Sequence, residues 1–467
     1  NLPPGSLKQS FEEDFVRSRP NLREYVQKLQ RWRDRYEEVL DKRTSKQHLE
    51  HCSHFLVEFQ HQKFDEVEVP GQYLKLEDNN SDFVKIARFV PTFELTRSSG
   101  ICTRRISILS HKGSVHSFAI QLPSARYCRR EERILQLLRC LNRILEKRKE
   151  TRRRGLVFST PAAIPFSPQL RLLESDRALI SLQDIYERHC EEFGMGKDDP
   201  IMAWAEKMRS TWTTGKSMVE FTNLRMELLD EISPKMVPET VLTRFMIRSM
   251  KTPSDLWLVR KHFTLSMAAS MFLTYVMFIS SRLPSRIHIS RNFGTVVMSD
   301  VVPTLNPQQP QFKSPDATPF RLTPNIQHFI GPVGIEGLLT SSLIAIGRTL
   351  SEPEREFEEY LSIFVRDEIN YWLAGMQRLP PGSAYAREAP RDTIYQNILE
   401  VVKRARLLSC KYEIEKNTQQ GPTTTPVSQT VLDLINSASN PSKLALQVSL
   451  RLSYLHSRSI MLTIFAF

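Results

Sequence analysis

Residues of the types that bind metals gather in one short segment near the start of the sequence. Zinc sites use histidine and cysteine side chains. Four histidines surround one cysteine in this segment: His48, His51, Cys52, His54 and His61. No second pair of ligands follows at the spacing of a structural zinc site. We therefore predict a solvated polar helix face and no metal site.

Two glycine-containing segments have the composition of phosphate-binding loops. The run TTGKS at 213–217 ends like such a loop, but Ser210 stands where the motif requires its first glycine. We interpret this run as a chance match, because no strand is predicted before it. The segment 331–337 lacks the dinucleotide-binding pattern and is predicted to be a loop. The sequence also lacks the GxSxG elbow of serine hydrolases.

The composition limits the classes of protein to which the chain can belong. The chain has 467 residues, of which 40% are hydrophobic and 25% charged; this fits about three folded units and excludes wholesale disorder. The 64 Lys and Arg residues against 52 Asp and Glu give a net charge of +12, which alone identifies no ligand. The 6 cysteines form no CxxC pair, which favours a reducing compartment.

No targeting or membrane segment is visible in the sequence. The first residues contain neither Met nor a charged-then-apolar leader, so we expect no signal peptide and a C-terminal part of a longer protein. The most apolar stretch, 267–279, is shorter than the roughly 20 residues that span a bilayer. We predict a buried core helix there.

Hydrophobic spacing divides the chain into a mixed first part and a helical second part. An amphipathic helix is predicted over 22–40, and short β-rich runs over 83–122 predict an antiparallel meander. A strong helix around 134–145 follows. Beyond residue 168 the helices are predicted over 181–192, 201–210, 224–232, 238–249, 255–278, 352–378 and 392–408.

The order of these pieces resembles the C-terminal end of a phosphatidylinositol 3-kinase-related kinase. PGQY at 70–73 is similar to the entry of that family's kinase N-lobe, RREER at 129–133 to its αC-type helix, and PFRLTPNI at 319–326 to the end of its activation loop. The resemblance implies an α+β, two-lobed protein-kinase-like fold of the PI3/PI4-kinase type. The expected units are the end of a helical FAT region at 1–62, an N-lobe at 63–165, a C-lobe at 166–416, a linker at 417–426 and a partial FATC segment with an aberrant tail at 427–467.

Phosphoryl transfer needs a lysine on the phosphates, a group that orients the attacking hydroxyl, and ligands for Mg²⁺. By the resemblance, Gln121 stands where the family has its phosphate-binding lysine. A neutral amide cannot supply the positive charge of that lysine. The first requirement of the chemistry is therefore predicted to fail.

The remaining catalytic positions are also altered. The family's catalytic loop reads GDRHPSN, and the matching stretch 280–286 reads SSRLPSR. Ser281 stands in for the catalytic Asp, Leu283 for the His and Arg286 for the metal-binding Asn. A cation repels Mg²⁺ from a ligand position. The metal-binding DFG reads DVV, with only Asp300 retained, so we predict a pseudokinase with no cofactor.

Within the family, these degenerate positions occur together with LREYV at 22–26, LQRWRD at 29–34 and RDEI at 366–369. This combination resembles the transformation/transcription domain-associated protein family and its fungal members. The resemblance implies a catalytically inactive, nuclear scaffold subunit of SAGA-type histone acetyltransferase complexes that contributes to activator recruitment and chromatin regulation. Its partners would be complex subunits and transcription activators, with no membrane contact and no sequence-specific nucleic-acid binding.

Two alternatives stay open. The chain is an active atypical Ser/Thr protein kinase if ATP and Mg²⁺ bind despite Gln121, Ser281 and Arg286. It is a nucleic-acid-binding module if the basic run 147–154 contacts DNA, which predicts a steep salt dependence of binding.

The C-terminal sequence departs from the family pattern. Residues 427–446 resemble the start of the FATC segment, which in the family ends in an aromatic-rich tail packed on the kinase lobe. The sequence QVS at 447–449 is what a read-through splice donor would encode. We therefore predict that residues 448–467 are a gene-model artefact. Transcript sequencing that shows continuous coding into Phe467 would refute this.

Overall fold

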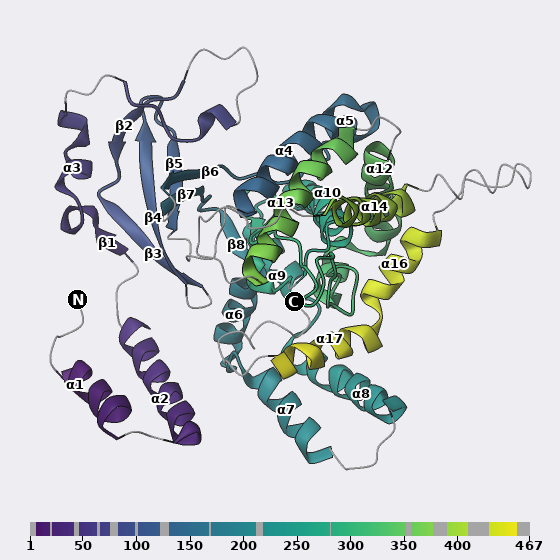
Figure 1. Cartoon of the computed structure of the whole chain (residues 1–467), viewed down its shortest axis with the longest axis horizontal. Coiled ribbons are helices and arrows are strands. Elements are labelled where there is room, and N and C mark those ends of the chain that lie inside the picture. Colours follow the sequence, from purple (N-terminus) through teal and green to yellow (C-terminus); the bar gives the residue numbers. More distant parts are fainter. Residues whose placement is uncertain are drawn as a thin grey trace, which may run out of the picture.

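The structure is a computed structural model with two lobes. Figure 1 shows a sheet-rich first lobe beside a larger helical second lobe, with the N-terminal helices apart from both. The structure describes residues 6–18, 21–41, 46–62, 66–74, 83–98, 101–121, 130–167, 170–211, 218–280, 282–351, 356–376, 390–409 and 429–454.

The N-terminal helices form a pair of their own. They are α1 (Ser6–Glu12), the π-helical turn η1 (Glu13–Arg17) and α2 (Leu22–Asp41), so the helix predicted over 22–40 is confirmed. The indole Nε1 of Trp32 donates a hydrogen bond to the Asp14 carboxylate at 2.7 Å, and the Phe11 ring lies edge-on to the indole. This contact holds the two helices together.

The first lobe is an antiparallel sheet in the order β1-β3-β4-β5-β7-β6, with β2 also paired to β4. The antiparallel meander predicted over 83–122 is confirmed by β3, β4 and β5. The strands are β1 (Lys46–His48), β2 (Ile86–Phe89), β3 (Thr92–Ser98), β4 (Ile101–Ser110), β5 (Val115–Gln121), β6 (Ala163–Ser167) and β7 (Leu170–Glu174). Short helices flank them: η2 (Leu49–His51), α3 (His54–Val57), η3 (Phe59–His61) and η4 (Gln72–Leu74).

A small apolar core holds this sheet together. It joins Val69, Ile108, Phe118 and Leu172, all buried, from segments far apart in the sequence. Since β6 and β7 continue the same sheet, we propose that the first lobe ends after Glu174 rather than at residue 165.

The second lobe is mostly helical, and each helix predicted between 181 and 408 has a counterpart among the described residues. Its helices are α6 (Leu182–Phe193), α7 (Asp199–Thr211), α8 (Met218–Met236), α9 (Val241–Ser249), α10 (Pro253–Val276), α11 (Pro324–Ile330), α12 (Thr340–Leu350), α13 (Glu356–Met376), α14 (Arg391–Leu408), α16 (Gln429–Ser439) and α17 (Pro441–Tyr454). Helices α4 (Arg130–Lys147) and α5 (Lys149–Arg154) belong to the first lobe by sequence, and α4 shares the apolar core of the second lobe. The shorter elements are β8 (Leu179–Ser181), η5 (Pro284–Arg286), β9 (Ile287–Ser290), β10 (Val296–Met298) and the π-helical turn η6 (Gly334–Leu339).

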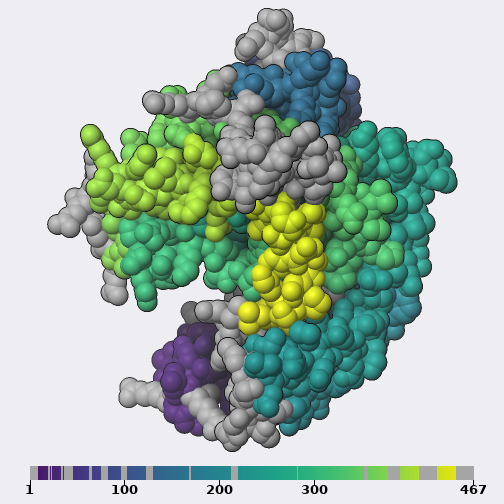
Figure 2. Space-filling model, turned by 90° about the vertical axis from the view of Figure 1, so that its right-hand side faces the viewer, coloured from purple at the N-terminus to yellow at the C-terminus, as the bar shows by residue number. Residues whose placement is uncertain are grey.

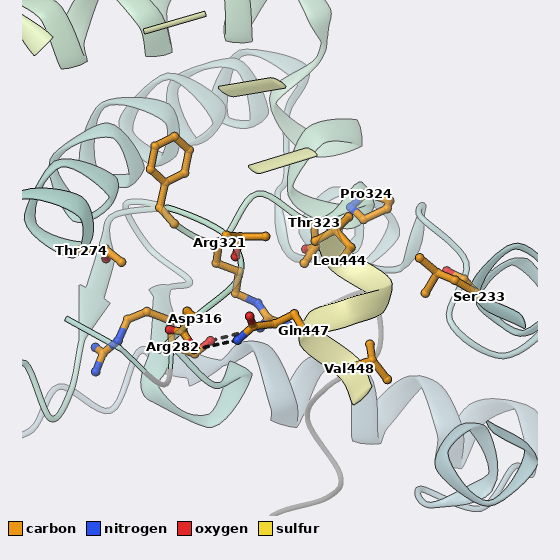
Figure 3. Close-up of a pocket in the computed structure, with 13 residues that line it drawn as sticks. Ser233, Thr274, Arg282, Asp316, Arg321, Thr323, Pro324, Leu444, Gln447 and Val448 are labelled. Carbon is orange, nitrogen blue, oxygen red and sulfur yellow. Dashed lines mark hydrogen bonds between the residues drawn. The ribbon is translucent and has the colours of Figure 1, made fainter. Parts of the chain in front are cut away.

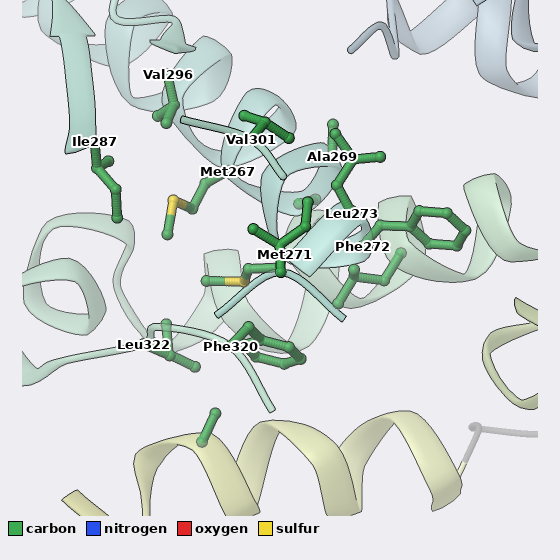
Figure 4. Close-up of a cluster of buried hydrophobic side chains, with 14 of the residues drawn as sticks. Met267, Ala269, Met271, Phe272, Leu273, Ile287, Val296, Val301, Phe320 and Leu322 are labelled. Atoms are coloured by element: carbon green, nitrogen blue, oxygen red, sulfur yellow. The ribbon is translucent and has the colours of Figure 1, made fainter. Parts of the chain in front are cut away.

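Helix α10 is the centre of the second lobe. Thr252 caps its start by accepting a hydrogen bond from the Asp255 backbone, and Pro253 occupies its first turn. Most residues of its second half are apolar and buried, as expected of a helix surrounded by protein. Figure 4 shows its residues Met267, Met271 and Phe272 among side chains of β9, β10 and the loop before α11.

The C-terminal helices pack on the second lobe. Val431, Ile435 and Ala445 are buried in its core, and α17 lies against α8. In Figure 2 these helices form the yellow band that runs down to the teal helices of the lobe. Within the described residues no single helix is long and apolar enough to cross a membrane, although α11 together with the η6–α12 segment passes such a test as a sharply bent pair.

Some sequence predictions differ from the structure or cannot be compared with it. The loop predicted at 331–337 is wrong, because η6 runs through it and continues into α12. The strands β6 to β8 were not predicted. The run 213–217, the linker 417–426 and residue 281 lie outside the described residues.

The turn between β9 and β10 is held against α10 by Gly294. This glycine has φ +74°, and a Cβ there would lie 2.6 Å from the backbone oxygen of Val259. The hairpin leads directly to Asp300, so this close approach helps to fix the position of that residue.

Substitution of Gly294 tests this contact. We expect Gly294→Ala to lower the free energy of unfolding, measured with urea. The left-handed conformation should cost about 1–2 kcal/mol and the clash about 1–3 kcal/mol more. The matched control is Gly113→Ala, which has φ +80° but no atom within 4 Å of the added Cβ. Equal losses in the two variants would contradict the proposed contact.

Helix α4 is attached to α13 by a row of ion pairs. The Nε of half-buried Arg130 donates to the Glu368 carboxylate at 2.8 Å, and the Arg130 guanidinium also lies 4.6 Å from the centre of the Tyr371 ring. The Arg133 guanidinium lies 3.5 Å from the Asp367 carboxylate. These contacts join the segments 129–133 and 366–369, both of which the sequence marks as family-like.

Removing the carboxylate of Glu368 is expected to destabilise the chain strongly. Glu368 is fully buried and only 18% of the Arg130 side chain is exposed, so Glu368→Ala leaves a largely buried charge without its carboxylate partner, at a cost of about 3–5 kcal/mol. Glu356 pairs with Lys147 between the same two helices but is partly exposed. Glu356→Ala should cost less than about 1 kcal/mol. Urea unfolding that gave similar losses for both would disprove a special role of the buried pair.

Candidate functional site

The segment between α10 and α11 carries the residues predicted to match a catalytic loop and a metal-binding motif. Leu283 is buried, and its carbonyl accepts the Arg286 backbone N–H at 2.9 Å, which starts the short helix η5. Ser281 lies outside the described residues. The β9–β10 hairpin then leads to Asp300, whose φ of +51° is unusual for a non-glycine residue.

Arg286 and Asp300 form an ion pair with each other. The Arg286 Nε lies 3.2 Å from the Asp300 Oδ2, with 35% and 40% of the two side chains exposed. These are the two positions at which the resemblance predicts Mg²⁺ ligands. An arginine that already occupies the carboxylate competes with a divalent cation for the same oxygen and repels it.

Buried Arg282 holds this loop in place by hydrogen bonds to its backbone. Its guanidinium donates to the backbone carbonyls of Ser280 at 3.1 Å, Ser299 at 3.2 Å and Asp300 at 2.9 Å. The carbonyl of Arg282 in turn accepts a hydrogen bond from Arg321 at 3.1 Å. Hydrogen bonds from a buried guanidinium thus fix the backbone of this loop.

Gln121 lies at the end of β5, opposite Arg171 on β7. Its amide oxygen accepts a hydrogen bond from the Arg171 Nε at 2.9 Å. The same guanidinium donates to Glu132 at 3.1 Å and pairs with buried Glu131, both in the first turn of α4. A cation is therefore present beside position 121, but it comes from the neighbouring strand.

The electrostatics of this cluster follow from its burial. Burial raises the pKa of Glu131, with a smaller contribution from the nearby Asp300 charge, while Arg171 opposes the rise. Burial alone would lower the pKa of Arg171, but the two carboxylates raise it, so this guanidinium stays charged. The positive charge of Arg171 is directed at α4 and not into an open site.

The described residues do not fit Mg²⁺ and a nucleoside triphosphate. The predicted lysine position carries an amide bonded to Arg171, and the retained Asp300 is paired with Arg286. Sequence reasoning missed the role of Arg171. The signal for it was a single cation inside the apolar strand LRLL at 170–173, where burial demands a partner.

A small cavity of about 60 Å³ lies beside the loop, and α17 closes it (Figure 3). The Gln447 amide donates to the Asp316 carboxylate at 2.7 Å and accepts the Ala317 backbone N–H at 2.6 Å. Leu444 and Val448 line the same cavity. Helix α17 is therefore bonded directly to the segment that precedes α11.

Comparison with known proteins assigns the chain to a family. Residues 117–373 match the family described as "Phosphatidylinositol 3- and 4-kinase". The chain is 39% identical over 459 residues to the "SAGA complex/NuA4 acetyltransferase complex subunit Tra1" of Schizosaccharomyces pombe, covering 95% of the chain and 12% of that protein. It is 31% identical to the human "Transformation/transcription domain-associated protein", covering 85% of the chain and 10% of that protein.

The solved structures agree in fold. The "FAT and kinase domain of CtTel1" has a TM-score of 0.59 and 18% identity, and the match covers 87% of this chain and 26% of that one. The chain spans about an eighth or less of the length of the curated relatives it matches. By the family match and the identity to these relatives, the chain belongs to the phosphatidylinositol 3- and 4-kinase family, in the branch of Tra1 and the transformation/transcription domain-associated protein.

Proposed function

We propose that the chain is the kinase-like part of a catalytically inactive scaffold subunit of SAGA-type histone acetyltransferase complexes. The printed name of its Schizosaccharomyces pombe relative, a subunit of the SAGA and NuA4 acetyltransferase complexes, supports this assignment. In this function the protein works in the nucleus, contacts other subunits and contributes to activator recruitment. The kinase fold provides a packed surface that does not depend on phosphoryl transfer.

The observation that carries the inactive assignment is the ion pair of Arg286 with Asp300. Phosphoryl transfer requires free ligands for Mg²⁺ between the phosphates and the protein. Here the carboxylate at one ligand position is neutralised by a cation at the other. The Gln121–Arg171 hydrogen bond supports the same conclusion at the phosphate-binding position.

Nucleotide binding provides the direct test. We expect millimolar ATP with Mg²⁺ to leave the unfolding temperature of the chain unchanged, while an active relative in the same family is stabilised in parallel. A dose-dependent stabilisation that requires Mg²⁺ and is lost in Asp300→Ala would instead favour the atypical Ser/Thr kinase.

The ion pair itself can be tested with a metal alone. Arg286→Asn removes the competing cation and places an oxygen ligand beside Asp300, so Mn²⁺ affinity should rise at least about tenfold, measured by electron paramagnetic resonance. Arg152→Asn removes an equal charge from an exposed position on α5 and should leave the affinity unchanged. Equal Mn²⁺ affinity in Arg286→Asn and the unaltered chain would contradict the assigned blockade.

A further inference from the structure

A Ser-Pro pair lies in the segment between β10 and α11. Lys313 and Pro315 are exposed and Ser314 is half-buried, and none of the three is part of a helix or a strand. Proline-directed Ser/Thr kinases accept a proline directly after the phosphorylated residue, because its ring fixes φ and leaves no backbone N–H that needs a partner. The pair therefore has the sequence and the setting of a substrate for such a kinase.

Two Thr-Pro pairs follow in the same segment and are less accessible. Thr318 lines the cavity that α17 closes, and Thr323 is only 4% exposed and directly precedes α11. Of the three prolines in these pairs, Pro315 is exposed and the other two are half-buried. A kinase binds its substrate as an extended segment, so covered residues must first open locally. Ser314 is therefore the residue of the three that a kinase reaches most readily.

The loop around Ser314 is anchored at both ends. On one side the backbone N–H of Lys313 donates to a carbonyl oxygen at 2.9 Å, and on the other the N–H of Ala317 donates to the Gln447 side chain at 2.6 Å. Between these anchors the Ser314 hydroxyl accepts a long hydrogen bond, 3.4 Å, from the Asp316 N–H. The serine itself is thus held weakly, and the loop is held mainly through its contact with α17.

Asp316 makes a second bond to α17. Its carboxylate accepts a hydrogen bond from the Gln447 amide at 2.7 Å, a contact drawn in Figure 3. The same helix contributes Leu444 and Val448 to the cavity lining. A change of charge at Ser314 is therefore only two residues from a carboxylate that holds α17 in place.

We propose that Ser314 is phosphorylated by a proline-directed Ser/Thr kinase and that the phosphate loosens α17. In this reaction the Ser314 Oγ bonds to the γ-phosphorus of ATP, the bond from that phosphorus to the β,γ-bridging oxygen breaks, and ADP leaves. The hydroxyl proton passes to the aspartate base of the kinase. The modifying kinase is a separate protein, so this proposal does not rest on the scaffold function or on nucleotide binding by this chain.

The phosphate opposes the contact between Asp316 and Gln447. It adds a charge of about −1.5 to −2 at neutral pH and three strong acceptor oxygens. The added charge repels the Asp316 carboxylate, and the added oxygens compete for its backbone N–H and for the Gln447 amide. Helix α17 also packs against α8, so the expected result is a loosened helix and not its complete release.

The first measurement is the rate of phosphate incorporation at each residue. The full 467-residue chain is incubated with a purified mitogen-activated protein kinase and ATP, and the sites are located by mass spectrometry. Each rate is divided by the rate at the same residue in a peptide spanning 310–326, which removes the preference of the kinase for local sequence. We expect this ratio to be at least about tenfold higher for Ser314 than for Thr318 or Thr323.

Two variants test whether the proline directs the reaction. Pro315→Ala should lower the rate at Ser314 at least about tenfold, because the kinase loses the ring that it recognises. Thr318→Ala is the matched control within the same segment and should leave the rate at Ser314 unchanged.

The second measurement is amide hydrogen exchange in α17 of the purified phosphorylated chain. Exchange over 441–448 should accelerate at least about tenfold relative to the unmodified chain, while α10 keeps its rate. Gln447→Leu removes the amide that bonds to Asp316, so α17 should already exchange faster in this variant. Phosphorylation should then add less than about twofold, because the contact it acts on is absent.

Four results would overturn the proposal. One is the absence of phosphate from Ser314 in the folded chain, and another is an equal rate in Pro315→Ala. A third is an equal ratio for Ser314, Thr318 and Thr323, which would show that exposure does not direct the modification. The fourth is unchanged exchange of α17 in the phosphorylated chain, which would separate the phosphate from the Asp316–Gln447 contact.

Discussion

Charged residues in the first turn of α4 form ion pairs with both lobes. Arg130 pairs with Glu368 of the second lobe, while Glu131 and Glu132 pair with Arg171 of the first lobe. Buried charges are tolerated only with partners, so neither lobe can move away from this turn without exposing one of them. Two residues of the candidate site adjoin this turn: Gln121 is hydrogen-bonded to Arg171, and the charge of Asp300 contributes to the raised pKa of Glu131.

Under the proposed function, this arrangement explains how a kinase-like fold persists without kinase chemistry. An active site of this class holds charged groups that contact the phosphates and metal ions of the substrate. In this chain each charged group has an internal partner: Asp300 has Arg286, and Arg171 has Glu131 and Glu132. The site is therefore held together by its own ion pairs without a ligand, and the hydrogen bonds of Arg282 fix the backbone of the loop.

The parts of the fold with strong local patterns could be predicted from the sequence. The helix at 22–40 and the meander at 83–122 follow from regular apolar spacing, and the fold class followed from the family-like motifs. The π-helical turn η6 could not be predicted, because three glycines between 331 and 337 favour a loop and tertiary packing overrides them. Within the candidate site, the alignment with the family pattern singled out Gln121, Arg286 and Asp300, but it could not indicate their partners. Arg130 and Glu368 are 238 positions apart, and nothing local in the sequence indicates which acid meets which base.

The bridge from Gln447 to the segment at Asp316 and Ala317 has a consequence for the order of synthesis. Helix α17 is synthesised after the other described elements of the second lobe. The segment before α11 therefore forms its contacts with Gln447 only after α17 has been made. Until then Leu444 and Val448 are missing from the lining of the cavity, and Phe320 on its opposite side is left uncovered there. The segment at Asp316 is therefore completed by a side chain that is synthesised 131 positions later.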